Sequence, residues 1–499
     1  MSLLVPRLRS VPIGLPNAQF VCRQCLRRGP KRDLQTVAST ASSPASSSRI
    51  LQHLRQPRRS ASTITAAKAS KRPTALPTSF FSTTTTRAAD SSAAPSIVPT
   101  GVAPSTSFPK QSSRSVAYWL LGSAASVFGI VVFGGLTRLT ESGLSITEWK
   151  PVTGSLPPRT REHWEAEFEK YRASPEFKML NSTMDLEEFK KIYWMEWTHR
   201  LWGRFIGLSF VLPTAYFIAR RRVTKPMAWN LLGISALIGF QGFIGWWMVS
   251  SGLKDDLFAP GSHPRVSQYR LTAHLATAFA CYSWMLLAGL SILRTRRLKA
   301  NPRQAAQLLT VLGSPVLRPF KRAFGIVTGL VCTTILSGAL VAGLDAGLIY
   351  NEFPKMGVGL APPSSELWDK FYSRKDDGSD LWWRNMLENP SLVQLNHRIL
   401  ATTTFCSIIA LFAYSRTGRV AAILPKQGQK GIMGLVHLAC LQVALGISTL
   451  IYIVPIPLAA AHQAGALALL TGTLVLGHRL RIPRSIMRDL TGKMQKMQN

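Results

Sequence analysis

The sequence predicts an all-α membrane protein with eight transmembrane helices, arranged as two tandem four-helix-bundle repeats. Three observations predict this fold class. Of the 499 residues, 46% are hydrophobic and only 17% are charged. The hydrophobic residues gather in eight segments, each close to the roughly 20 residues that a helix needs to cross a bilayer. The second half of the chain also repeats features of the first half in the same order.

The eight predicted membrane segments follow one another from residue 115 onward. They are 115–136, 195–219, 227–249, 271–293, 324–344, 392–413, 432–453 and 458–476. Several contain glycine or a polar residue, which transmembrane helices tolerate where they pack against one another. The segments leave little of the chain for a soluble domain, so we expect an integral membrane protein.

The internal repeat rests on four separate stretches that recur in the same order. The first is ungapped, since residues 134–144 align with residues 338–348. The other matched positions are His199 with His397, Gln241 with Gln442, Gly245 with Gly446, and His274 with His462. Chance is a poor explanation for this agreement. Ligand sites of duplicated membrane proteins often lie inside or between the repeats.

The N-terminal region differs in composition from the rest of the chain. Residues 1–115 hold 17 Lys or Arg against two acids, and Ser, Thr, Ala and Pro fill much of the remainder. A leader rich in Arg and Ser and poor in acids is typical of a mitochondrial transit peptide. The alternative is a disordered basic tail that binds nucleic acid.

Basic residues are sorted by loop, which predicts the orientation. They follow the second, fourth, sixth and eighth segments, with eight Lys or Arg and no acid between Arg294 and Arg322. The loops at the opposite ends hold nearly all the acids. The positive-inside rule then places both termini and the basic loops in the mitochondrial matrix. These charges therefore need no nucleic-acid partner.

Together the repeat and the charges divide the chain into five parts. We expect a transit peptide and disordered linker at 1–114, an N-terminal four-helix repeat at 115–298, a matrix linker at 299–318, a C-terminal four-helix repeat at 319–480 and a basic matrix tail at 481–499.

Four histidines occupy matching places in the two halves, near the starts of the even-numbered segments. They are His199, His274, His397 and His462. Two facing imidazoles inside a helical bundle can hold a haem iron by both axial positions. The predicted topology puts all four toward the intermembrane space, so we expect two haem sites side by side. The alternative for each histidine is a hydrogen-bonding residue at a helix end.

One acidic residue distinguishes the two halves. Glu196 precedes His199 by three residues, which places both on nearly the same helix face. The matching residue in the second half is Gln394. A carboxylate at the membrane edge is a functional candidate and can exchange a proton, whereas a glutamine cannot. We therefore expect Glu196 to be catalytic; the alternative is an ion pair with Arg200.

Four arginines are expected at the same membrane face as the histidines. They are Arg138, Arg200, Arg270 and Arg398. Arginine binds carboxylates bidentately, so these side chains are candidates for holding haem propionates. The alternative is that they extend to the membrane interface without a ligand.

Three of these features together resemble the haem A synthase family. They are Glu-Trp-Thr-His-Arg-Leu-Trp-Gly-Arg at 196–204, Gly-Leu-Thr-Arg at 135–138, and the duplicated histidines. The resemblance covers residues 115–480. It implies an enzyme that oxidises the C8 methyl group of haem O to the formyl group of haem A, for cytochrome c oxidase. It also implies a resident haem b on His397 and His462, with haem O between His199 and His274.

The resemblance further implies partners. A ferredoxin-type protein would exchange electrons, haem O synthase would supply the substrate, and membrane lipid would surround the helices; a homo-oligomer stays open. Many bacterial members carry a cysteine pair in the loop after the first helix. Residues 141–193 contain no cysteine, so a thiol relay in that loop is excluded.

Two other functions stay open from the sequence. One is a di-haem b-type membrane electron carrier, and the other is a haem transporter or assembly factor without catalysis. An electron carrier of this kind usually holds its haems near opposite membrane faces. The expected position of all four histidines near one face argues against it.

Overall fold

Eight long helices form the body of the structure, a computed structural model that describes residues 107–254, 257 and 264–489. These residues belong to the second of two units, Pro99–Asn499. The transit-peptide prediction falls almost wholly outside the described residues, and so does the end of the predicted basic tail. Within the described residues the secondary structure is helical, with one isolated β-bridge between Met356 and Gly359.

The predicted number of membrane-spanning helices is confirmed. Among the described residues, eight helices are long and apolar enough to cross a membrane. They are α2 (Arg114–Leu139), α5 (Leu186–Ala219), α6 (Lys225–Val249), α7 (Gln268–Ala300), α9 (Leu317–Gly343), α12 (Pro390–Ser415), α14 (Lys426–Ile451) and α15 (Ile456–Arg479).

Helix α5 begins earlier than hydropathy predicted, at Leu186 instead of residue 195. Asp185 caps it by accepting a hydrogen bond from the backbone N–H of Glu188 at 2.7 Å. The added turns bury Phe189 and Tyr193 against α3 (Arg161–Arg172), chiefly at Trp164. Charged residues lie between these aromatic positions, so this stretch did not stand out as a membrane segment.

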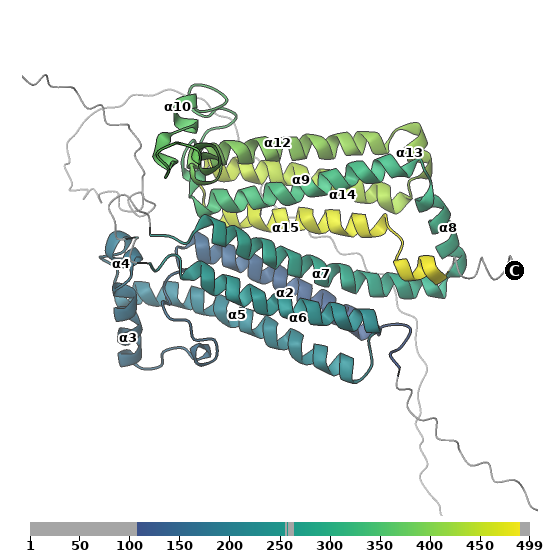
Figure 1. Cartoon of the computed structure of the whole chain (residues 1–499), viewed down its shortest axis with the longest axis horizontal. Helices are drawn as coiled ribbons and strands as arrows, with labels where there is room; N and C mark the ends of the chain where they lie inside the picture. The colour runs from purple at the N-terminus through teal and green to yellow at the C-terminus, as the bar shows by residue number, and fades with distance from the viewer. Residues whose placement is uncertain (1–106, 255–256, 258–263, 490–499) are drawn as a thin grey trace, which may run out of the picture. The chain divides into compact units, whose positions relative to one another are not determined.

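The eight helices form two bundles (Figure 1). Helix α2 contacts α5 and α7, and α6 also contacts both, which closes the first bundle. Helix α12 contacts α9 and α14, and α15 also contacts both, which closes the second. The bundles meet where α7 packs on α9 and where α15 packs on α2 and α7. The predicted division of the chain into two repeats, and the duplication behind it, stay predictions.

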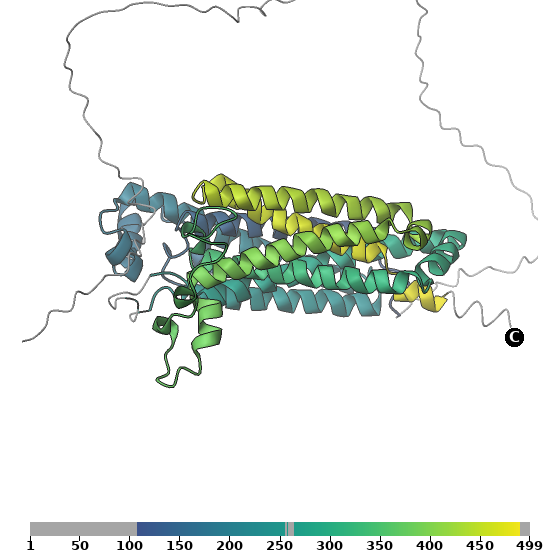
Figure 2. The ribbon, with the colours of Figure 1, turned by 90° about the horizontal axis from the view of Figure 1, so that it is seen from above.

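Each bundle has its own apolar core. Phe210, Leu231 and Met285 are fully buried in the first. Phe320 and Ile432 are fully buried in the second. Between membrane helices such side chains leave lipid and not water, so they stabilise each bundle through close van der Waals packing. The helices run along one common direction, as Figure 2 shows from above.

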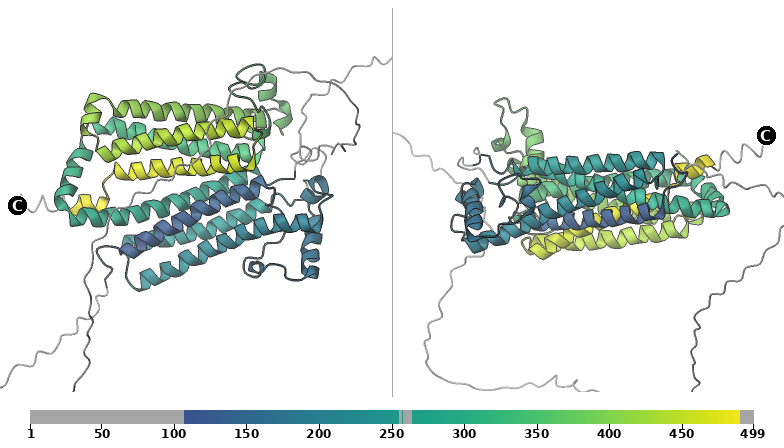
Figure 3. Two further views of the ribbon diagram at one scale, coloured as in Figure 1. Left: turned by 180° about the vertical axis from the view of Figure 1, so that it is seen from behind. Right: turned by 90° about the horizontal axis from the view of Figure 1, so that it is seen from below.

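The two ends of the bundles differ in their connections (Figures 1 and 3). At one end, here called the loop end, lie α3, α4 (Pro175–Leu180), α10 (Ser364–Leu367) and α11 (Leu381–Glu388), with short 3₁₀ turns at Thr153–Ser155, Ala346–Leu348 and Lys370–Tyr372. At the other, here called the basic end, lie α8 (Pro302–Gly313) and α13 (Gly418–Ile423). The residues considered next gather toward the loop end.

Candidate functional site

Each of the four histidines packs its ring against a glycine on a neighbouring helix. A Cβ added to the glycine would lie closer to the imidazole Cε1 than ordinary van der Waals contact allows. The distances are 2.8 Å for Gly134 and His199, 3.0 Å for Gly245 and His274, 3.1 Å for Gly338 and His397, and 2.9 Å for Gly446 and His462. A side chain at any of these glycines would have to displace the ring.

The structure brings the histidines together in two pairs. His199 and His274 lie on α5 and α7 of the first bundle, and His397 and His462 lie on α12 and α15 of the second. In each bundle the two helices stand at opposite corners of the ring of four. The imidazoles therefore face the bundle interior from opposite sides.

Both pairs fit a haem. The Nδ1 atoms of His199 and His462 are buried without a hydrogen-bond partner, so these rings are not held by an ordinary structural role. The glycines leave room for each ring to lie against the neighbouring helix. Two imidazoles suit the axial positions of haem iron, whose other four ligands come from the porphyrin.

A glutamine on the preceding helix contacts one histidine of each pair. Gln241 Nε2 donates to the backbone carbonyl of His274, and Gln442 Nε2 donates to that of His462, both at 3.0 Å. Sequence comparison of the two halves matched these glutamines but gave them no role. Their contacts fix the start of the histidine-bearing helix in each bundle.

Glu196 is buried, with 2% of its surface exposed, and its carboxylate is fully occupied. Its Oε1 accepts from Arg200 Nη2 at 2.6 Å and Nε at 3.0 Å. Its Oε2 accepts from Ser145 Oγ and from the backbone N–H of Ile146, both at 2.7 Å. The ion pair with Arg200 is therefore present, and the carboxylate also ties the loop after α2 to α5.

Gln394 holds the matching loop of the second bundle with the opposite hydrogen-bond polarity. Its Nε2 donates to the backbone carbonyls of Ala346 at 2.8 Å and Ile349 at 2.7 Å. Glu196 accepts at this place, whereas Gln394 donates. The sequence showed the Glu-to-Gln difference but not this anchoring role, because the partners are backbone groups of a distant loop.

The two arginines that follow the histidines bind the same loops. Arg200 donates to the carbonyls of Ile146 at 2.7 Å and Glu148 at 3.0 Å. Arg398 donates to those of Tyr350 at 2.8 Å and Glu352 at 3.0 Å. Both arginines directly follow a histidine, and both are hydrogen-bonded to backbone carbonyls of the protein.

The other two arginines also have protein partners. Arg138 Nη2 donates to both carboxylate oxygens of Asp345, at 2.7 and 2.8 Å, and so links α2 to the second bundle. Arg270 donates to the backbone carbonyl of Trp247 at 2.6 Å, and its guanidinium lies 4.4 Å from the centre of that indole ring.

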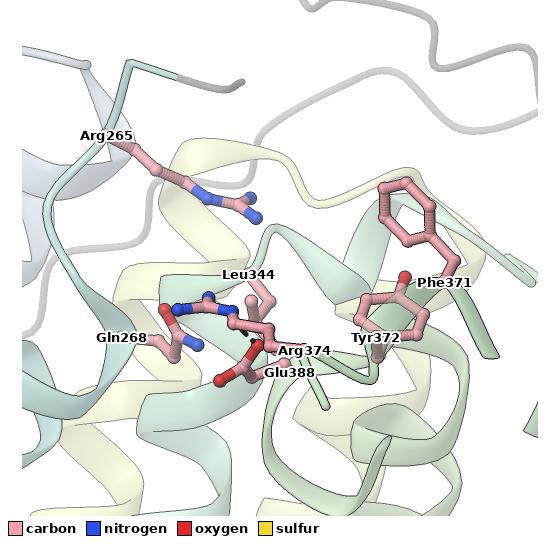
Figure 4. A pocket seen from close by; sticks show the side chains of 7 residues that line it. All are labelled: Arg265, Gln268, Leu344, Phe371, Tyr372, Arg374 and Glu388. Atoms are coloured by element: carbon pink, nitrogen blue, oxygen red, sulfur yellow. Dashed lines mark hydrogen bonds and ion pairs between the residues drawn. The ribbon is translucent and has the colours of Figure 1, made fainter. Parts of the chain in front are cut away.

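A cavity of ≈ 290 Å³ opens at the loop end and is lined from both bundles (Figure 4). Its lining residues are Arg265, Gln268, Leu344, Phe371, Tyr372, Arg374 and Glu388. Burial lowers the pKa of Arg265 from its ordinary value. Arg374 pairs with Glu388 at 3.4 Å. None of the predicted site residues lines this cavity.

Comparison with known proteins identifies the family. The family model described as cytochrome oxidase assembly protein, COX15-CtaA, matches residues 117–474. Heme A synthase COX15 of Saccharomyces cerevisiae is 51% identical over 381 residues, which cover 76% of this chain and 78% of the relative.

Two further relatives extend the comparison. The heme A synthase–mitochondrial ferredoxin fusion protein of Schizosaccharomyces pombe is 54% identical over 375 residues, covering 74% of this chain and 61% of the fusion. Heme A synthase COX15 of Homo sapiens is 44% identical over 374 residues, covering 74% of this chain and 84% of the relative. With these matches over most of its length, the chain belongs to the haem A synthase family.

Proposed function

We propose that this member of the family binds haem O between His199 and His274 and keeps a haem b between His397 and His462. The relatives are named heme A synthases, and we assign to this chain the oxidation of haem O to haem A. The observation that carries the proposal is the pair of histidines on opposed helices of each bundle, each ring lying on a glycine.

The division of roles rests on the difference between the bundles. Only the first has a carboxylate one helical turn before its histidine, at Glu196. A haem iron bound there would supply the oxidising chemistry. The chain's own residues would bind and orient the substrate and handle protons. Glu196 Oε2 is the atom we assign to hold a proton. When protonated it would donate to Ser145 Oγ, whose own hydrogen would turn toward the Ile192 carbonyl.

The arginines would complete the sites at the loop end. Arg138 and Arg270 lie at the ends of α2 and α7, whereas Arg200 and Arg398 lie inside α5 and α12, next to the histidines. Each of these arginines already has a protein partner. A haem propionate would therefore share the arginine with a protein carbonyl or carboxylate. Arg200 and Arg398 are the stronger candidates because each directly follows a histidine.

Membrane placement follows from the spans and the relatives. The protein is a multi-pass protein of the mitochondrial inner membrane. We propose that the basic end faces the matrix and the loop end the intermembrane space. A ferredoxin-type electron donor is supported by the relative in which a mitochondrial ferredoxin is fused to the synthase. Haem O synthase would deliver the substrate.

Identification of the bound haems tests the proposal. The full chain would be purified, and its haems extracted and identified by mass. We expect haem B together with haem O, a hydroxylated intermediate or haem A. Replacing His397 or His462 by Ala should remove the haem b spectrum, whereas His199→Ala or His274→Ala should remove only the O- and A-type haems. Haem B alone at both pairs would instead indicate a di-haem electron carrier.

A further inference from the structure

We propose that Ser337 makes the second histidine pair a permanent haem site by fixing the proton of His397 on Nδ1. Phe133, at the matching place in the first bundle, leaves His199 without this bond, so a haem there can exchange. The inference rests on the proposed assignment of haem b to the second pair. It adds the residues that decide which site retains its haem.

The hydrogen bonds around Ser337 have a defined direction. Ser337 Oγ lies 2.8 Å from the backbone carbonyl of Thr334, which can only accept, so the serine hydroxyl donates its hydrogen there. The same Oγ lies 2.7 Å from His397 Nδ1. With the serine hydrogen assigned to the Thr334 carbonyl, Oγ accepts from this nitrogen. His397 then carries its proton on Nδ1, and its Nε2 is free to bind iron.

Ser337 is itself held in position against α12. Thr334, one turn earlier on α9, has its Oγ1 2.7 Å from Thr404 Oγ1. That hydroxyl is also 3.3 Å from the backbone carbonyl of Leu400. Gly338, directly after Ser337, forms the surface on which the His397 ring rests. The imidazole is thus fixed in rotation and in protonation by one face of α9.

The first bundle lacks this arrangement. The ungapped match of 134–144 with 338–348 places Phe133 opposite Ser337. The Phe133 ring lies nearly parallel to that of His199, at 9° and 6.4 Å between centroids. His199 Nδ1 is buried without a hydrogen-bond partner. The ring is therefore held only by packing against Phe133 and Gly134, and neither residue selects a tautomer.

The partner histidines are held alike in the two bundles. Gln241 Nε2 donates to the His274 carbonyl, and Gln442 Nε2 donates to the His462 carbonyl. Gln241 Nε2 also lies 3.1 Å from Nδ1 and 3.4 Å from Nε2 of His274, so it fixes neither tautomer. The contact of Ser337 with His397 Nδ1 is therefore the difference between the bundles on which the inference rests.

The two sites differ in how firmly they hold a haem because only His397 has a hydrogen bond from its outer ring nitrogen to a serine. Loss of an outer hydrogen bond to a histidine ligand typically weakens metal binding by about 10–100-fold. A site without such a bond can bind its substrate and release its product, as turnover requires. A site with the bond keeps its cofactor through many turnovers.

The test compares haem retention and reduction potential in the purified full-length protein. Ser337→Ala removes the acceptor, so transfer of haem b to excess apomyoglobin should speed up by about 10-fold or more. Its midpoint potential should rise, because a histidine that no longer donates from Nδ1 is a weaker electron donor to ferric iron. Ser337→Thr keeps the hydroxyl and should restore both values. Unchanged retention and potential in Ser337→Ala would overturn the inference.

A reciprocal change and a control keep the test decisive. Phe133→Ser should slow release of the O- and A-type haems from the first site and leave the haem b potential unchanged. Unaltered release would count against the role of Phe133, even if Ser337→Ala failed to fold. His397→Ala separates the two proposals. If it keeps haem b, the proposed assignment fails; if it loses haem b while Ser337→Ala is unaffected, only this inference fails.

Discussion

Gln463 fills the space beside Gly135 and so joins the two bundles next to their histidines. Its Oε1 lies 1.6 Å from the place that a Cβ of Gly135 would take, and its Nε2 donates to the backbone carbonyl of Val131 at 2.8 Å. Gln463 directly follows His462, and Gly135 directly follows the glycine that supports His199. A single contact thus connects the neighbourhoods of both pairs.

Gly135→Ala should destabilise this junction by about 1–3 kcal/mol, because the new methyl group displaces Gln463 from Val131. Thermal unfolding of the detergent-purified protein measures the effect. Gln463→Ala makes room for the methyl group, so the double variant should be less destabilised than the sum of the single variants. Simple additivity would contradict the contact. Gly122→Ala on the same helix is the control, since nothing lies within 4 Å of a Cβ there.

Alanine at the glycines beside the histidines should remove one haem at a time. Gly338→Ala places a methyl group 3.1 Å from His397 Cε1 and should abolish the haem b absorption spectrum. Gly134→Ala, at 2.8 Å from His199, should leave that spectrum but lose the O- and A-type haems. Gly329→Ala on α9 meets nothing within 4 Å and serves as the control. Loss of both haems in either variant would contradict two independent sites.

Hydropathy and internal alignment together predicted the spans and found all four histidines with their glycines. Hydropathy succeeded because the lipid-facing and core-facing surfaces of these helices are both apolar. It missed the start of α5, where charged residues alternate with Phe189 and Tyr193. The pairs Arg138–Asp345 and Gln463–Gly135 had no local signal, since each joins segments far apart in the chain. The sequence did not single out Ser337, because a serine before a glycine has no particular meaning unless its contact with a histidine is known.

Glu176 should make the loop end sensitive to pH. Burial raises the pKa of its carboxyl group to about 8, and the group accepts a hydrogen bond from Tyr171 at 2.9 Å. The folded state then holds a proton that the unfolded state, with the ordinary value of 4.5, has released. This contribution to stability is complete at low pH and is lost as the pH rises from 4.5 to about 8.

The measurement is thermal unfolding at about pH 6 and about pH 9, compared with Glu176→Gln. The variant keeps a neutral side chain of the same size, so its melting temperature should change less between the two conditions. If the melting temperature changed equally in both proteins, ionisation of Glu176 would not destabilise the folded state.

Single-cysteine labelling should establish the orientation. In a background without the native cysteines, Glu162→Cys on α3 and Gln304→Cys on α8 place a thiol on an exposed position at each end. An impermeant reagent applied to mitoplasts should reach residue 162 but not residue 304, because the basic end is retained in the matrix. The reverse labelling would overturn the placement of the histidines toward the intermembrane space.

Glu196→Gln should abolish haem A formation, and the geometry shows how to separate catalysis from anchoring. The glutamine Nε2 must face either Arg200 or the N–H of Ile146, and both are donors. The variant therefore loses a charge-assisted bond as well as the titrating group. Ser145→Ala removes one bond to Oε2 but leaves the carboxylate, so it is the matched control for anchoring.

If Glu196 transfers a proton, Glu196→Gln should lower haem A formation by about 10²–10⁴-fold, with haem O or its hydroxylated intermediate accumulating and haem b intact. Ser145→Ala should then lose far less activity at a similar loss of melting temperature. Gln394→Glu sets a carboxylate against the carbonyls of Ala346 and Ile349. It should destabilise the second bundle without creating a second reactive site. Equal loss of haem A in Ser145→Ala and Glu196→Gln would reduce Glu196 to an anchor for the loop after α2.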